Sequence, residues 1–228
     1  MASTGRADAG PPAWALARPE LSRRLTSRPG RLRLALTGGV ASGKSRVARL
    51  FEALGGKQVD LDDLARQVTA PGEAGHRAAI ELLGPGCLGP DGSLDRTKIS
   101  RVIFADPPTR LLLEEALHPL IWESLERELA ALDLEPAVVI SIPLLFEKNL
   151  QTLFHPIVLV FAGQAIQLSR LLARQPSLSP DEAGLILEAQ WPAGLKIKGA
   201  DFIINNDGEW AATEAQVLAL WSRLLADA

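Results

Sequence analysis

From residue 31 onward, short apolar runs alternate with longer stretches of helical period. The short runs are rich in Leu, Val, Ile and Ala, and they fall at residues 32–36, 137–142, 157–161 and 202–204, while a further short strand is expected at residues 58–59 after the Gly55-Gly56 pair. Runs of this length and composition are typical of strands that are buried on both faces. Their alternation with helical stretches predicts βαβ units on a parallel sheet, and therefore an α/β fold with three layers.

Helical periodicity marks the segments between these runs. Helices are expected at residues 44–54, 165–174 and 210–225, with a shorter one starting at Ser179-Pro180-Asp181-Glu182. The last helix is expected to place Trp210, Val217, Leu218 and Trp221 on its apolar side. Residues 62–134 are predicted to be mostly helical, with turns at residues 84–86 and 89–92.

The N-terminal segment has a different composition. Residues 1–30 are rich in Ala, Arg, Pro, Ser and Gly and show no sustained period, which predicts a poorly ordered extension. An organelle transit peptide or a basic arm for an anionic partner are the alternatives. A secretory signal is excluded because no apolar run of about 7 to 15 residues follows the arginines.

Composition and length narrow the class of protein to which this chain can belong. The 228 residues, 47% of them hydrophobic, suffice for a core that needs no disulfide or structural metal. Cys87 is the single cysteine, which favours a reducing compartment, and we expect a cytoplasmic protein. The longest apolar stretches fall short of the roughly 18 residues of a spanning helix, so no membrane partner is expected.

Charge is spread unevenly along the chain. Residues 1–31 carry a net charge of +4, whereas residues 32–228 carry −7. An acidic body argues against nucleic acid as the main partner, because binding to a phosphate backbone depends on clustered Lys and Arg.

The motif with the clearest chemistry follows the first expected strand. It is Gly38-Gly39-Val40-Ala41-Ser42-Gly43-Lys44-Ser45, which fits the P-loop pattern between a strand and a helix. Glycines let backbone N–H groups close around phosphate oxygens at the positive end of the helix. Lys44 is expected to meet the β and γ phosphates and Ser45 to hold Mg²⁺. A glycine-rich turn that feeds a helix is the alternative.

The P-loop leaves three classes open, namely a small-molecule kinase, a GTPase switch and a motor-type ATPase. A kinase needs an acidic base and a lid. A GTPase needs an Asn-Lys-x-Asp string, and the nearest match is Ile197-Lys198-Gly199-Ala200-Asp201, with Ile in place of Asn and the Asp one residue late. This departure weakens the switch hypothesis.

An acidic pair ends the second expected strand. Asp60 and Asp62 lie in Val59-Asp60-Leu61-Asp62-Asp63, at the carboxyl edge of the sheet where ligands of such folds bind. An ordinary helix N-cap is an equally good interpretation of these aspartates.

With these motifs in place, the sequence closely resembles the dephospho-CoA kinase family, from about residue 34 to the final helix. The resemblance rests on the P-loop, Asp60-Leu61-Asp62, Ala65-Arg66-Gln67-Val68, Pro71-Gly72, Asp91-Gly92, Leu94-Asp95-Arg96, His118-Pro119-Leu120-Ile121, Ile142-Pro143-Leu144-Leu145-Phe146-Glu147, Gln167, Arg170, Arg174, Gln190, Lys196, Ala200-Asp201 and Ile204-Asn205. It implies ATP-dependent phosphorylation of the ribose 3′-hydroxyl of dephospho-CoA, the last step of coenzyme A synthesis.

The resemblance also implies roles for individual residues. Asp62 looks like the general base, Asp60 an organiser of Mg²⁺ or its waters that also faces substrate, and Arg66 a substrate-side residue. Arg174 looks like the lid arginine, and Asn205 lies beside the adenine of ATP.

Further ATP and substrate contacts are implied along the same motifs. ATP contacts are expected from Gly39, Val40, Ala41, Ser42, Gly43, Lys44, Ser45 and Arg46. Residues 143–147 are expected to line the substrate pocket, with Pro143, Leu144 and Glu147 as the substrate contacts and the apolar members of the stretch alternatively part of the core. His118 either binds substrate or ends a helix in a His-Pro turn.

Three positions depart from the family pattern. Ala41 replaces a glycine of the loop, Leu61 replaces a small residue between the aspartates, and Gln175-Pro176 follows Arg174 where an acidic residue is usual. None of them removes a residue with an assigned chemical role, so activity is still expected.

Together these features predict a P-loop kinase domain over residues 31–228. Within it, residues 62–134 are expected to be a helical substrate-binding insertion and residues 175–199 a lid. Lys44, Asp62 and Arg174 are the expected catalytic residues, with ATP and Mg²⁺ as cofactors. A kinase for another nucleoside, nucleotide or metabolite hydroxyl is the alternative, and the oligomeric state is left open.

Overall fold

The computed structural model describes residues 23–228 of the chain. Two compact units are present. The sheet unit comprises the described residues up to Val59 together with Leu132–Ala228, and the helical unit comprises Asp60–Ala131. The prediction for residues 1–22 lies outside the described residues.

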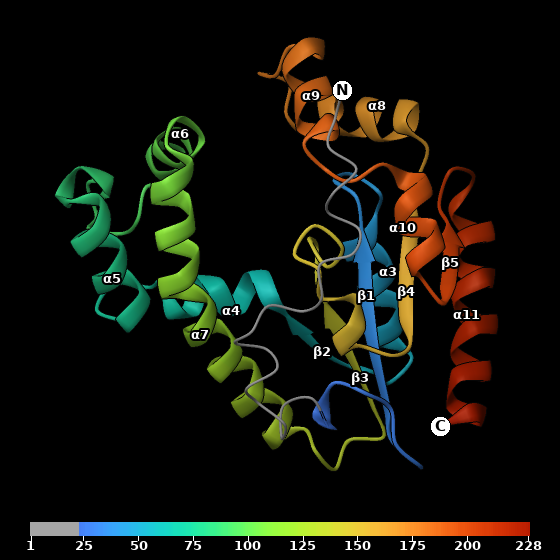
Figure 1. Cartoon of the computed structure of the whole chain (residues 1–228). Helices are drawn as coiled ribbons and strands as arrows, with labels where there is room; N and C mark the ends of the chain where they lie inside the picture. Colours follow the sequence, from blue (N-terminus) through green and yellow to red (C-terminus); the bar gives the residue numbers. More distant parts are fainter. Residues whose placement is uncertain (1–22) are drawn as a thin grey trace. The chain divides into compact units, whose positions relative to one another are not determined.

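A five-stranded sheet forms the centre of the sheet unit (Figure 1). Its strands are β1 (Leu32–Gly38), β2 (Lys57–Asp60), β3 (Ala137–Ser141), β4 (Ile157–Phe161) and β5 (Phe202–Asn205), in the order β2-β3-β1-β4-β5. β1 runs parallel to β3 with Leu36 opposite Ser141, and parallel to β4 with Thr37 opposite Leu159. The predicted α/β class with a parallel sheet and flanking helices is confirmed.

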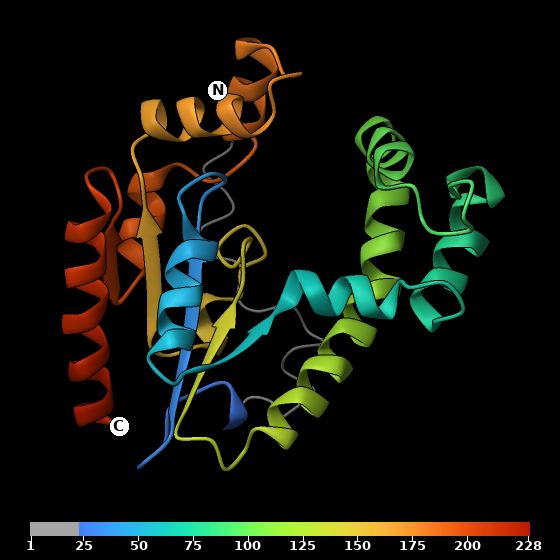
Figure 2. The same cartoon turned by 180° about the vertical axis from the view of Figure 1, so that it is seen from behind.

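One face of the sheet carries the main core. All seven residues of β1 are buried, and Leu32, Leu34 and Leu36 alternate onto the face covered by α3 (Lys44–Ala53) and α11 (Trp210–Asp227). Figure 2 shows α3 lying across this face. Burial of each such leucine contributes about 1.5–3 kcal/mol, which stabilises β1 at the centre of the sheet.

Arg33 is the exception in β1, because its side chain is charged and only 1% exposed. Its guanidinium donates hydrogen bonds to the backbone carbonyls of Leu32, Leu132, Asp133 and Glu135 at 2.9–3.2 Å. Burial lowers the pKa of Arg33 from its ordinary value. The buried charge is tolerated because its donors are matched by carbonyl oxygens.

The predicted poorly ordered extension is wrong for residues 23–30. Leu25 is 1% exposed, the Ser27 hydroxyl donates to the Arg33 carbonyl, and the Gly30 amide donates to the Ala228 carbonyl at 2.7 Å. The segment lacks helical or strand period because tertiary contacts, rather than regular secondary structure, fix its position. The order of this segment was therefore not visible in the hydrophobic pattern.

Four more helical elements of the sheet unit lie between residues 132 and 209. They are η2 (Gln151–Leu153), α8 (Gln164–Arg174), α9 (Pro180–Glu188) and α10 (Ala193–Gly199). The predicted start of α9 is confirmed, because Ser179 and Glu182 form a capping box. One expectation for α11 is wrong, since Leu218 is 43% exposed while Val217 and Trp221 are buried. Residues one apart on a helix lie about 100° apart, so Leu218 falls at the solvent margin of the apolar face.

The helical unit consists of α4 (Leu61–Val68), α5 (Ala74–Leu83), η1 (Pro85–Cys87), α6 (Arg96–Ala105) and α7 (Pro107–Ala131). α7 packs against α4, α5 and α6. His118-Pro119 lies inside α7 rather than at a helix end, so the interpretation of this pair as a C-terminal turn is wrong. Tertiary packing carries the helix past Pro119 although the proline has no N–H to donate. In residues 23–228, no helix combines the length and apolarity that crossing a membrane requires.

Candidate active site

The P-loop connects the buried strand β1 to α3. Gly43 stands at the N-cap of α3 with φ 94°, in the left-handed region that glycine adopts without strain. Its carbonyl accepts hydrogen bonds from the amides of Arg46 and Val47. The first amides of α3 therefore lie at the positive end of the helix dipole, an arrangement that favours phosphate.

Ala41 adopts a left-handed backbone conformation, which is unfavourable for an alanine. Its φ is 56°, in the left-handed region that disfavours a residue with a Cβ by about 1–2 kcal/mol. This is the position at which the sequence departs from a glycine. The loop is thus held in shape by contacts outside Ala41 itself.

Lys44 is the first residue of α3, and its ammonium group donates a hydrogen bond to the Ser141 hydroxyl. Ser141 is 1% exposed and ends β3, the strand next to β1. The lysine charge is therefore fixed at the carboxyl edge of the sheet beside the P-loop.

A second group of contacts holds the distal half of the loop. Asn206 is buried, and its Nδ2 donates to the Ser42 carbonyl at 2.7 Å. Arg170 of α8 donates to the carbonyls of Asn206, at 2.8 Å, and Ser42, at 3.4 Å. A Cβ at Gly43 would lie 2.2 Å from Asn206 Nδ2, so the close approach of Asn206 requires glycine at that position.

Asn205 and Arg46 were expected at the nucleotide. Asn205 is exposed, and its backbone N–H and carbonyl are bonded to the Gln216 side chain. The Arg46 guanidinium lies 3.7 Å from the centre of the Trp210 ring. The side chain of Arg46 thus packs on α11, while its backbone amide lies in the first turn of α3. A role for both residues in nucleotide binding stays a prediction.

Glu147, expected at the substrate, anchors the segment around α10. Its Oε1 lies 2.6 Å from Lys196 Nζ and accepts a hydrogen bond from the Trp191 amide at 3.0 Å. The Lys196 and Glu147 side chains are only 4% and 12% exposed. Phe146 stacks on Trp191 with ring centres 6.4 Å apart. These contacts fix residues 191–196 on the loop that follows β3.

In that same loop, Leu145 and Phe146 are core residues, whereas Leu144 is 41% exposed and Pro143 is half-buried. The alternative of a core role therefore applies to Leu145 and Phe146. A substrate contact by Pro143, Leu144 or Glu147 stays a prediction.

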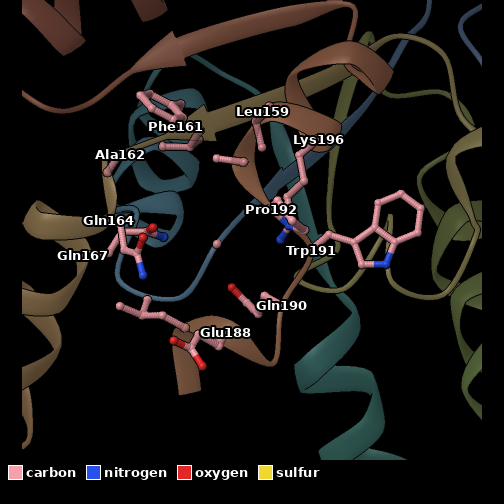
Figure 3. Close-up of a pocket in the computed structure, with 14 residues that line it drawn as sticks. Leu159, Phe161, Ala162, Gln164, Gln167, Glu188, Gln190, Trp191, Pro192 and Lys196 are labelled. Atoms are coloured by element: carbon pink, nitrogen blue, oxygen red, sulfur yellow. The ribbon is translucent and has the colours of Figure 1, made fainter. Parts of the chain in front are cut away.

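A cavity of about 410 Å³ lies beside the P-loop in the sheet unit. Gly39, the end of β4, α8 and the segment from Leu187 to Lys196 line it. Figure 3 shows Gln167, Gln190, Trp191 and Lys196 around this space. Its lining combines apolar residues at the end of β4 with the side-chain amides of Gln164, Gln167 and Gln190.

The acidic pair lies at the junction of β2 and α4. Asp60 is the N-cap of α4 and its Oδ1 accepts a hydrogen bond from the Asp62 amide at 2.8 Å. The capping interpretation of Asp60 therefore applies. Asp62 occupies the first turn of α4, where the helix dipole stabilises its carboxylate.

Arg66 lies one turn further along α4. Its guanidinium pairs with Asp63, and both side chains are more than half exposed. Exposed pairs of this kind contribute little to stability. A substrate contact by Arg66 stays a prediction.

Two further predicted residues occupy separate helices. Arg174 is exposed and is the last residue of α8. His118 is half-buried in the middle of α7. Asp62, Arg66 and His118 belong to the helical unit, whereas Lys44 and Arg174 belong to the sheet unit.

Four side chains at the loop, including that of Arg170, had no role assigned from the sequence. Asn206, next to the expected Asn205, makes the contact with the loop. Gln167 and Gln190 each bond the backbone of Val40. They are among the residues that carry the family resemblance, but the sequence gives no signal that a side chain from residue 190 reaches residue 40.

Comparison with known proteins shows to which family this chain belongs. The sequence profile of the dephospho-CoA kinases matches residues 32–212. The chain belongs to the dephospho-CoA kinase family. The dephospho-CoA kinase of Parasynechococcus marenigrum is 43% identical over 176 residues, which cover 77% of this chain and 88% of that protein. That of Geobacillus kaustophilus is 37% identical over 191 residues, covering 83% and 94%.

Solved structures agree with the fold. A crystal structure of a Thermus thermophilus protein is 32% identical and superposes with a TM-score of 0.75, covering 85% of this chain and 98% of that one. The dephospho-CoA kinase of Campylobacter jejuni, 22% identical, shares the fold with a TM-score of 0.63 over 85% of this chain and 97% of its own. The family predicted from the sequence is confirmed, and kinases of this family use ATP.

Proposed function

We propose that this protein transfers the γ-phosphoryl group of ATP to the ribose 3′-hydroxyl of dephospho-CoA, giving coenzyme A and ADP. The observation that carries the proposal is a P-loop with Lys44 fixed against Ser141, in a chain whose residues 32–212 match the dephospho-CoA kinase profile. Family membership supports the substrate, and the loop geometry supports the phosphate donor.

Phosphoryl transfer requires a general base, positively charged groups that stabilise the phosphoryl oxygens, and a leaving group. Asp62 accepts the proton of the 3′-hydroxyl, the oxygen attacks the γ-phosphorus, and the bond to the β-phosphate oxygen breaks as ADP leaves. Lys44 and the amides at the start of α3 stabilise the charge on the phosphoryl oxygens. Arg174, at the exposed end of α8, meets the transferring group from the lid.

Mg²⁺ fits the available donors. The Ser45 hydroxyl and the Asp60 carboxylate would hold the ion, because Mg²⁺ prefers oxygen ligands. When bound, the ion neutralises phosphate charge. Asp60 also keeps the first turn of α4 in place through its hydrogen bond to the Asp62 amide, so that it orients the base.

The substrate is assigned to residues of the helical unit and of the loop that follows β3. Arg66 and His118 are proposed to contact dephospho-CoA, with Pro143, Leu144 and Glu147 at the loop after β3. Residues 62–134 form the substrate-binding region of a kinase domain over residues 31–228, and residues 175–199 form the lid. The ATP contacts are those of residues 39–46 with Asn205.

The single cysteine and acidic body support a cytoplasmic enzyme that acts on a small molecule, with neither nucleic acid nor membrane as a partner.

The proposal is tested by measuring ADP release from MgATP with dephospho-CoA, adenosine, AMP or no acceptor. Turnover with dephospho-CoA that exceeds the other acceptors is the expected result. Preferred turnover with another hydroxyl would instead make the protein a P-loop kinase for that acceptor and overturn the proposed substrate.

A further inference from the structure

Two glutamine side chains hold both main-chain groups of Val40. The Val40 amide donates to Gln190 Oε1 at 2.8 Å, and Gln167 Nε2 donates to the Val40 carbonyl at 2.8 Å. Gln167 comes from α8, and Gln190 from the segment between α9 and α10. Figure 3 shows the two side chains reaching toward the loop from these different segments. We call this pair the glutamine clamp.

Glycine at position 39 is explained by the clamp. A Cβ on Gly39 would lie 2.5 Å from Gln167 Nε2 and 3.2 Å from Gln190 Oε1. The first distance is shorter than van der Waals contact permits, so any larger residue displaces the clamp. The general P-loop pattern allows any residue here, so the close approach of the clamp gives a specific reason for glycine at this position.

The glutamine clamp also affects the backbone conformation of Ala41, the residue that follows Val40. The Val40 carbonyl and the Ala41 N–H belong to one planar trans peptide and point in opposite directions. Because Gln167 binds the carbonyl, the Ala41 N–H is turned away from Gln167. The rotation of this same peptide sets φ of Ala41 at 56°, a conformation that costs an alanine about 1–2 kcal/mol when nothing holds it.

We propose that Gln167 and Gln190 are positioning residues for ATP, and that they hold the Val40–Ala41 peptide in the orientation that phosphate binding requires. The inference rests on the proposed function, since it takes the P-loop to bind ATP. Neither glutamine needs to touch the nucleotide. Their effect is exerted through the backbone of the loop, and the loss of either one releases the strained alanine into conformations that do not bind phosphate.

The test uses full-length protein and MgATP in isothermal titration. Gln167→Met and Gln190→Met keep side-chain length and remove the hydrogen bond, and each is expected to weaken MgATP binding by about 5- to 10-fold. Ser169→Ala is the control on the same helix, because Ser169 is exposed and does not belong to the lining of the cavity beside the P-loop. Its MgATP affinity should stay within about twofold of wild type. In turnover assays the KM for ATP should rise while the KM for dephospho-CoA is unchanged.

Repeating the substitution in a protein that also carries Ala41→Gly distinguishes a positioning role of the glutamines from a general packing role. Ala41→Gly removes the energetic cost of the left-handed conformation, so the loop depends less on the two glutamine hydrogen bonds to keep its shape. Gln190→Met should therefore weaken MgATP binding less in the Ala41→Gly background than in wild type, by a factor of about two or more. Thermal unfolding of every variant establishes that the chain is folded.

The outcomes are distinct. MgATP affinity unchanged in both folded methionine variants, or an equal loss in the two backgrounds, would overturn the inference while leaving the proposed function intact. Wild-type protein that binds no MgATP would overturn the proposed function and the inference with it.

Discussion

The ammonium group of Lys44 donates a hydrogen bond to the hydroxyl of Ser141, which ends the neighbouring strand β3. The sequence places these residues almost a hundred positions apart, and the parallel pairing of β1 with β3 brings them together. An amine held in this way needs little reorganisation when phosphate charge develops beside it.

Replacing Lys44 tests this preorganisation. Lys44→Ala should lower kcat by about 10²-fold or more, because it removes a charge aimed at the phosphoryl oxygens. Steady-state kinetics with MgATP measure the effect. Lys57→Ala is the control, since Lys57 is an exposed lysine at the start of β2, and it should turn over normally. Near-normal turnover of Lys44→Ala would remove the role assigned to Lys44.

Asp62 tests the assignment of the base. Asp62→Asn should lower kcat by about 10² to 10⁴-fold with little change in folding, because the amide cannot accept the hydroxyl proton. The neighbouring Asp63→Asn, in the same first turn of α4, should cost less than about tenfold. Equal losses in the two variants would show that charge in this turn, rather than proton transfer at Asp62, is what matters.

The buried pair of Glu147 and Lys196 is expected to dominate the stability of the segment around α10. Lys196→Met leaves the Glu147 carboxylate without its cation at 12% exposure, and should lower the free energy of unfolding by about 3–5 kcal/mol. Adding Glu147→Gln should recover much of this loss, because the unpaired charge is then gone. Urea unfolding of the single and double variants measures both effects, and a double variant no more stable than Lys196→Met contradicts the account.

The pairing of Asp133 with arginines near the N-terminal end of β1 predicts that the free energy of unfolding depends on pH. The pKa of Asp133 lies below its ordinary value, chiefly because Arg28 donates a hydrogen bond to the carboxylate, with Arg31 and Arg24 adding positive charge. The carboxyl therefore binds protons less readily in the folded chain than in the unfolded one. Its contribution to stability is present above the unfolded pKa, about 3.9, and is lost as the pH falls through the lower folded value.

Asp133→Asn should accordingly destabilise the protein at neutral pH, and its difference from wild type should shrink as the pH falls toward about 3. Urea midpoints measured for both proteins across this range give the comparison. A difference that stays constant with pH would contradict the role of this ion cluster.

Much of the sheet was predictable from the sequence, because continuous apolar runs such as residues 137–142 have few alternatives to a buried strand. The P-loop was predictable for a similar reason, since its glycines and Lys44 satisfy a local geometric requirement. Leu218 was misplaced because a helical period fixes the margin of an apolar face only to within about one residue.

What the sequence did not reveal depends on contacts between distant segments. Residues 23–30 are ordered by Leu25, Ser27 and the pairing of their arginines with Asp133, and none of these leaves a periodic signal. Asn206 is likewise indistinguishable from Asn205 in the sequence, and only the approach of its amide to the Ser42 carbonyl separates the two.

The central claim is tested most directly by the position of the new phosphate. Dephospho-CoA and MgATP are incubated with the protein, and phosphorus–proton coupling in the product spectrum locates the added phosphoryl group, with the 3′-deoxy analogue of dephospho-CoA as the control acceptor. The account predicts a phosphate on the ribose 3′-oxygen and no product from the 3′-deoxy analogue. A phosphate at another oxygen, or equal turnover of the 3′-deoxy analogue, would contradict it.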